Sequence, residues 1–134
     1  MIIVRRESLS IQTSTDVVLV RQLARQWAID LNFGLVDQTK IVTAASELAR
    51  NTFTHGGGGA VVVEILERDG RRGLRLTFTD RGPGIPDIEL ALKDGYTTGG
   101  GLGLGLGGSR RLVNEFPLTS QVGTGTFVSV TKWK

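Results

Sequence analysis

The chain has 134 residues, no cysteine and a formal net charge of +3. This length indicates one domain, residues 1–134, able to bury roughly two thirds of its unfolded surface. Hydrophobic and charged fractions of 40% and 22% exclude disordered and fibrous classes. Without cysteine there is no disulfide or thiolate metal site. No Lys/Arg run exceeds two residues, and no apolar run approaches a membrane span. We therefore expect a cytoplasmic protein that binds neither nucleic acid nor membrane.

The first half of the chain predicts a strand followed by two helices. Residues 2–11 favour a strand, and Ser14 or Asp16 caps a helix that runs to about Asn32 and is stopped by Gly34. A second helix spans 36–53 behind an Asp37 N-cap. Helical spacing predicts the core faces of the two helices. These are Val20, Leu23, Ala24, Trp27 and Leu31 in the first, and Ile41, Ala45, Leu48 and Thr52 in the second.

The second half predicts two hairpins separated by a glycine-rich region. Strands at 60–66 and 74–79 flank an Asp69-Gly70 turn, and the final residues form a hairpin of 118–122 and 126–133. Short helices are expected at 88–93 and from Ser109 to about Phe116. The order β-α-α-β-β-loop-α-β-β predicts an α+β fold, a two-layer sandwich of helices on a mixed, mostly antiparallel sheet.

Glu47 and Asn51 lie four residues apart at the edge of the apolar stripe of the second helix. A carboxylate and a carboxamide in this position can look into a cleft, one as a general base and the other as a metal ligand. Taken alone, such a pair more often forms a solvated polar face. His55, the single histidine, stands beside a glycine turn, where capping or packing is the commoner role.

Two glycine-rich segments follow. Asp80-Arg81-Gly82-Pro83-Gly84 is an acid at a strand end before a tight turn, which by itself is also compatible with a decorated β-turn. In the tract 97–108, leucines alternate with glycines, so the loop can dock as a lid, and the helix that opens from it can cradle an anion. A formal G-x-G-x-x-G match lacks the preceding strand of a dinucleotide site, and the Gly-Lys-Ser/Thr of a phosphate loop is absent.

Together, these segments resemble the three-box pattern of the gyrase, Hsp90, histidine kinase and MutL ATPases, the GHKL superfamily with the Bergerat fold. The boxes are 47–51, 80–84 and 99–108, in the same order and spacing. The resemblance implies Mg·ATP as the ligand, Asn51 as the Mg²⁺ ligand and Glu47 as the base that activates the attacking group. It implies that Asp80 accepts the adenine amino proton. Other residues implied to contact the nucleotide are Gly82, Gly84, Ile85, Thr98, Gly99, Gly100, Gly101, Leu102, Gly103, Leu104, Gly105 and Thr126.

Within the superfamily, most of the chain is similar to the RsbT-type switch-protein serine/threonine kinases of bacterial stressosomes. The segments that carry this resemblance are 36–38, 46–51, 80–87, 94–95, 99–106 and 132–133. It implies a serine/threonine protein kinase with two partners, STAS-domain substrates (RsbS/RsbR-like) and a PP2C-type phosphatase (RsbU-like) that the released kinase activates. Two alternatives stay open. The segment 54–56 is nearer the anti-sigma kinases (RsbW/SpoIIAB-like), and an ATPase fragment of a larger machine would carry the same boxes.

Overall fold

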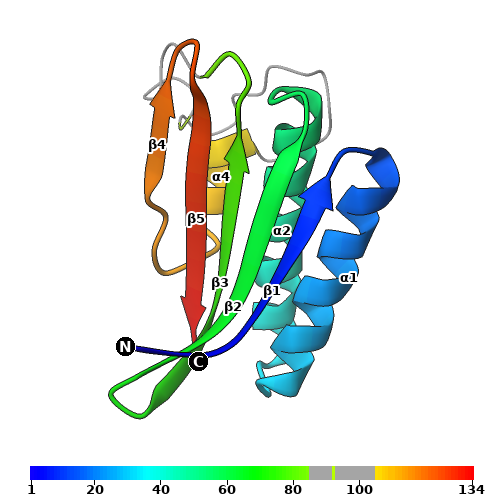
Figure 1. Cartoon of the computed structure of the whole chain (residues 1–134). Helices are drawn as coiled ribbons and strands as arrows, with labels where there is room; N and C mark the ends of the chain where they lie inside the picture. The colour runs from blue at the N-terminus through cyan, green and yellow to red at the C-terminus, as the bar shows by residue number, and fades with distance from the viewer. Residues whose placement is uncertain (85–91, 93–104) are drawn as a thin grey trace.

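The computed structural model describes residues 1–84, 92 and 105–134. Its elements follow the predicted order of strands and helices (Figure 1). They are β1 (Ile2–Ile11), α1 (Ser14–Asp30), α2 (Leu35–Thr54), β2 (Gly59–Arg68), β3 (Arg71–Asp80), α4 (Gly105–Arg110), β4 (Leu118–Gln121) and β5 (Gly125–Trp133). The expected helix at 88–93 falls outside the described residues, apart from position 92, which is a turn.

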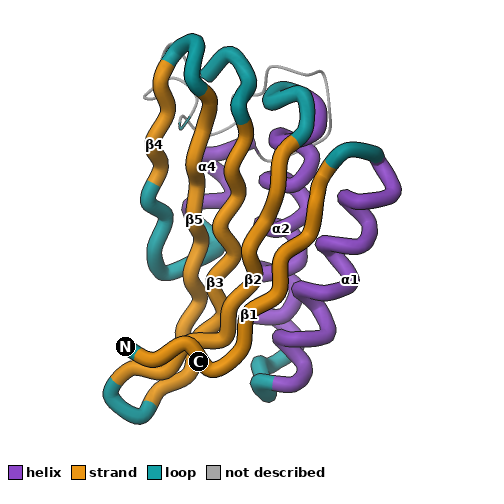
Figure 2. Tube along the Cα trace, in the orientation of Figure 1, coloured by secondary structure: helices purple, strands orange, loops and turns teal. Residues whose placement is uncertain are grey.

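The five strands form one sheet in the order β1-β2-β3-β5-β4. Every neighbouring pair is antiparallel, so the expectation of a mixed sheet is wrong for the described strands. Hairpins produce the β2–β3 and β4–β5 pairs, and β1 and β5 each add to the central hairpin in the opposite direction to their neighbour. The described helices form a second layer on one face (Figure 2), which confirms the α+β two-layer sandwich.

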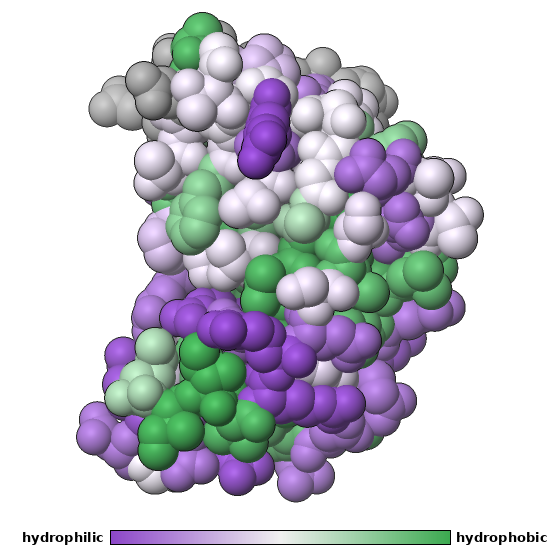
Figure 3. Space-filling model, in the orientation of Figure 1, coloured by the Kyte–Doolittle hydropathy of each residue, from purple (hydrophilic) through white to green (hydrophobic). Residues whose placement is uncertain are grey.

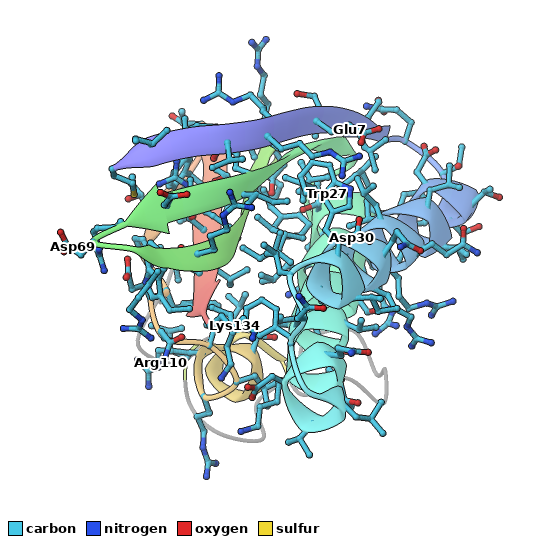
Figure 4. The ribbon with its side chains drawn as sticks, turned by 90° about the horizontal axis from the view of Figure 1, so that it is seen from below. Glu7, Trp27, Asp30, Asp69, Arg110 and Lys134 are labelled. Atoms are coloured by element: carbon cyan, nitrogen blue, oxygen red, sulfur yellow. The ribbon has the colours of Figure 1, made fainter. Side chains whose placement is uncertain are left out.

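The core lies between the two layers and is filled from α1, α2 and the inward face of the sheet. Figure 4 labels Trp27 between β1 and α1, where its side chain is 1% exposed. The predicted face of α2 is confirmed, since none of its four members exceeds 3% exposure. Burying each large apolar side chain contributes roughly 1.5–3 kcal/mol. This packing fixes α2 against the sheet, and thereby fixes the residues on its free edge.

The helix boundaries differ from those predicted. Thr13, rather than Ser14 or Asp16, is the N-cap of α1, because its side chain accepts from Asp16 N while the Asp16 carboxylate accepts from Thr13 N in a capping box. Asn32, with φ 62°, adopts the left-handed conformation after α1. Gly34 is instead the N-cap of α2. The prediction of an Asp37 N-cap is therefore wrong, and Asp37 lies in the first turn of α2.

The prediction of a helix from Ser109 to about Phe116 is also wrong, because α4 begins at Gly105 and ends at Arg110. The following residues run beside β5: Asn114 N donates to Thr131 O at 2.9 Å, and Glu115 and Thr131 form an antiparallel bridge. The Trp133 indole N–H donates to Glu115 Oε2 at 2.7 Å. Pairing with β5 thus satisfies backbone groups that a longer helix would have used.

The face of the sheet opposite the helices carries a polar band. Hydrophilic side chains cross it in Figure 3, and below them lies an apolar patch, near the exposed start of β1. Glu64, 3% exposed, accepts from Arg6 of β1 at 2.8 Å and from Arg75 of β3 at 2.9 Å. Burial acts to raise the pKa of Glu64, but the hydrogen bonds and charges of the two guanidiniums together lower it. Among the described helices, none has the length and apolar character needed to cross a membrane.

Candidate functional site

The first part of the site is the edge of α2. Glu47 is 8% exposed, and its Oε1 accepts from Arg50 Nη1 at 2.7 Å. Asn51, one turn later, is half-buried. Its carbonyl accepts from His55 N at 2.9 Å and Gly56 N at 3.1 Å, which ends the helix. A carboxylate this well buried does not belong to a solvated polar face. That alternative for the Glu47 and Asn51 pair is therefore excluded for Glu47.

The second part is the end of β3. Asp80 is the last residue of that strand and lies opposite Gly59 of β2 and Thr126 of β5. Its Oδ1 accepts from Gly82 N at 2.9 Å and from Thr126 N at 3.2 Å. These two backbone donors fix the carboxylate and hold Thr126 against it. The Thr126 hydroxyl is also 3.0 Å from Ser120 Oγ of β4. Sequence reasoning named Asp80, Gly82 and Thr126 separately, and the sheet register brings them together.

Glycine contacts join these two parts. A Cβ on Gly56, directly after α2, would stand 2.5 Å from Asp80 Cγ and 2.6 Å from its Oδ2. A Cβ on Gly82 would meet the Gly56 Cα at 2.7 Å. Only glycine allows such approach. The ends of α2 and β3 therefore touch at the upper end of the sheet in Figure 1. The sequence indicated only a glycine turn beside His55 and gave no sign that Gly56 would contact Asp80.

The turn after Asp80 is tied to the β4–β5 hairpin. Gly84 has φ 80°, and Gly123 N donates to Pro83 O at 2.9 Å. Gly105 is the first residue of the six-residue α4, which packs on α2. The remaining predicted contacts lie outside the described residues, and for them the assignments stay predictions. They are Ile85, Thr98, Gly99, Gly100, Gly101, Leu102, Gly103 and Leu104.

The described groups offer complementary chemistry on α2 and at the end of β3, which the close approach of Gly56 joins. Glu47 offers a carboxylate oxygen, Asn51 a carboxamide, and Asp80 a carboxylate that backbone N–H groups already hold. No cluster of three or more His, Cys, Asp or Glu suited to a metal ion occurs within 1–84, 92 and 105–134. Mg²⁺ bound with a nucleotide usually takes only one or two protein oxygens, the rest coming from phosphates and water. The residues present fit that mode.

Comparison with known proteins gives the class. Residues 36–134 match the family described as histidine kinase-, DNA gyrase B- and HSP90-like ATPase. This match spans more than half of the chain, and the chain belongs to that family of ATP-binding domains. Over 123 residues it is 48% identical to the serine/threonine-protein kinase RsbT of Bacillus subtilis (strain 168), covering 92% of each chain. Within the family it is a serine/threonine-protein kinase of the RsbT type, as the sequence resemblance predicted.

Other relatives are more distant. The anti-sigma F factor of Geobacillus stearothermophilus is 35% identical over 101 residues, 70% of this chain and 68% of that one. A solved structure of the RsbU and RsbW domains of a Mycobacterium tuberculosis protein superposes with a TM-score of 0.67 at 23% identity. The superposition covers 97% of this chain and 33% of the mycobacterial chain. The mycobacterial sensor histidine kinase MprB gives a TM-score of 0.56 at 20% identity. Both structures bear on the fold alone, and they agree with the predicted Bergerat fold.

Proposed function

We propose that this kinase transfers the γ-phosphate of Mg·ATP to a serine or threonine hydroxyl of a STAS-domain stressosome protein of the RsbS or RsbR type. Once released, it activates a PP2C-type phosphatase of the RsbU type by binding it. Residues 1–134 act as one catalytic domain in the cytoplasm. One observation carries the proposal: a buried carboxylate, Glu47, lies one helical turn before Asn51 on the helix whose end touches Asp80.

In this proposal Asp80 recognises adenine. Its Oδ1 is occupied by two backbone donors, and its Oδ2 accepts from the exocyclic amine. A hydrogen bond to a charged group contributes about 1.5–3 kcal/mol, and guanine, which has a carbonyl at that position, is rejected. The adenine ring is lined by four further residues, Gly82, Gly84, Ile85 and Thr126. The closing of the segment 99–105 over the phosphates is assigned from the three-box resemblance alone, because only Gly105 of this segment is among the described residues.

Asn51 supplies the protein ligand to Mg²⁺, through its side-chain oxygen. The ion, when bound, neutralises part of the phosphate charge and so favours attack at phosphorus. The half-buried position of Asn51 on a packed helix supports this role, because a ligand on a rigid element is held in place before the ion arrives.

Glu47 accepts the proton of the attacking hydroxyl. Its burial supports this role, since a carboxylate withdrawn from water presents a defined oxygen to the acceptor. The acceptor protein brings the hydroxyl, so the site is complete only in the complex. The chain alone should therefore turn ATP over slowly.

The second candidate is an anti-sigma factor that sequesters a sigma subunit and uses ATP to choose between partners. The 35% identity to the anti-sigma F factor favours it, although the 48% identity to RsbT spans more of the chain. Incubation with γ-labelled ATP separates the two. We expect label on a serine or threonine of an RsbS-type STAS protein and no stable complex with a sigma factor. A tight sigma complex without transfer to the STAS protein would support the second candidate instead.

A further inference from the structure

Arg50 makes a contact that the nucleotide assignments leave unused. It follows Glu47 by three residues on α2, and its Nη1 donates to Glu47 Oε1 at 2.7 Å. We propose that Arg50 is a positioning residue for the phosphoryl transfer. It holds Oε1 of Glu47 and thereby directs Oε2 towards the acceptor hydroxyl. The inference rests on the proposed function, in which Glu47 receives the proton.

The burial of this ion pair distinguishes it from ordinary surface pairs. The Glu47 side chain is 10% exposed and the Arg50 side chain 48%, so a withdrawn carboxylate meets a cation that comes in from solvent. The pair of Arg72 and Glu67 is exposed at both ends, at 53% and 38%, and such pairs contribute little. A buried carboxylate, in contrast, depends on its partner for charge compensation.

The helix gives this contact a fixed geometry. Arg50 follows Glu47 by three residues, so the two side chains leave the same face of α2. The neighbouring residues Leu48 and Ala49 are 1% and 0% exposed, which anchors the backbone of that turn in the core. With its backbone fixed, Glu47 still has three side-chain torsions, and the charge-assisted hydrogen bond to Arg50 restricts them. A base held by a third group is the usual arrangement for proton abstraction.

The chemistry balances without any change at Arg50. As the acceptor oxygen bonds to the γ-phosphorus, its proton moves to Oε2 of Glu47. The bond from the γ-phosphorus to its bridging oxygen breaks, and ADP leaves with those electrons. Arg50 keeps its hydrogen bond to Oε1 throughout. Among the described groups, Arg50 contacts Glu47 through one guanidinium nitrogen, Nη1. A lysine, which offers one cationic donor of similar reach, should therefore replace Arg50 in part.

The test uses the whole chain, Mg·ATP and a purified RsbS-type STAS protein, with kcat and the KM for ATP measured separately. Arg50→Met keeps an unbranched aliphatic stem and removes the charged donor, so kcat should fall about 10- to 100-fold, as expected for a reacting group misplaced by about 1 Å. The KM for ATP should not change. Arg50→Lys should recover most of the lost kcat. Arg72→Met is the matched control and should transfer phosphate at the wild-type rate.

A double-mutant cycle separates positioning from mere stability. In a Glu47→Gln background, Arg50→Met should cause no further loss of kcat, because its effect passes through the missing carboxylate. If Glu47→Gln is inactive but Arg50→Met and Arg50→Lys transfer at or above the wild-type rate, the inference is wrong and the proposed function stands. If Glu47→Gln itself retains full activity, the proposed function fails. Thermal melting of each variant identifies any loss due to unfolding.

Discussion

Replacement of Asp80 by asparagine tests the adenine pocket most sharply, because the two oxygens of this carboxylate have different partners. Oδ1 accepts from Gly82 N and Thr126 N. Oδ2 lies beside Gly56 and, in our proposal, accepts from the adenine amine. Asparagine has only one oxygen. In either orientation its NH₂ group therefore faces a donor, either the adenine amine or the two backbone N–H groups.

The expected loss has two parts. A charge-assisted hydrogen bond worth about 1.5–3 kcal/mol disappears, and facing donors leave an unsatisfied group that costs about 1–3 kcal/mol. Together they amount to about 2.5–6 kcal/mol, which weakens ATP binding roughly 10²- to 10⁴-fold. Calorimetric titration with Mg·ATP measures this, and circular dichroism should show an intact fold. Asp69→Asn, in the turn at the opposite end of the sheet, is the isosteric control and should bind normally. An Asp80→Asn affinity within about threefold of wild type would refute the adenine assignment.

Two further predictions concern the packing around the site and the polar band. Gly56→Ala would drive a Cβ to 2.5 Å from Asp80 Cγ, so ATP affinity should fall by about tenfold or more, whereas Gly34→Ala, with open space around its Cβ, should bind normally. Equal affinities would contradict the contact. Arg75 and Arg6 hold the pKa of Glu64 below its ordinary 4.5. The ionised Glu64 therefore stabilises the folded state fully above pH 4.5, and this contribution is lost as the pH falls through the lowered pKa. Denaturant unfolding from pH 6 to 3 should therefore show a stability gap between wild type and Glu64→Gln that closes on acidification. Glu67→Gln, the exposed control on β2, should run parallel to wild type, and a Glu64→Gln gap that stays constant with pH would exclude the ion-pair explanation.

The features predicted correctly are those that local pattern determines. The buried side of α2 follows from helical periodicity, and the β2–β3 hairpin follows from Asp69-Gly70, whose φ values of 52° and 76° fit a tight turn. The sequence also predicted the order of the elements and showed the three-box resemblance. Glu47 and Asp80 were identified by the order and spacing of the three boxes, because each acid taken alone was also compatible with a structural role.

The features missed depend on partners distant in sequence. Nothing near residues 111–117 indicates that β5 will hydrogen-bond to Asn114 and Glu115 instead of allowing a helix. The approach of Gly56 to Asp80 requires the β2–β3 register, which a linear reading does not contain. Arg50 was passed over because an arginine three residues after a glutamate is ordinary on a helix surface. The burial of Glu47 is what distinguishes the contact of Arg50 from an ordinary surface ion pair.

The most direct test of the central claim is single-turnover phosphoryl transfer by Glu47→Gln to an RsbS-type STAS protein, with Mg·ATP binding measured on the same preparation. Glutamine keeps the size of the side chain and removes its capacity to accept a proton. The account predicts near-normal nucleotide affinity and a transfer rate reduced by roughly 10²- to 10⁴-fold. Transfer at the wild-type rate, with ATP still bound, would contradict it.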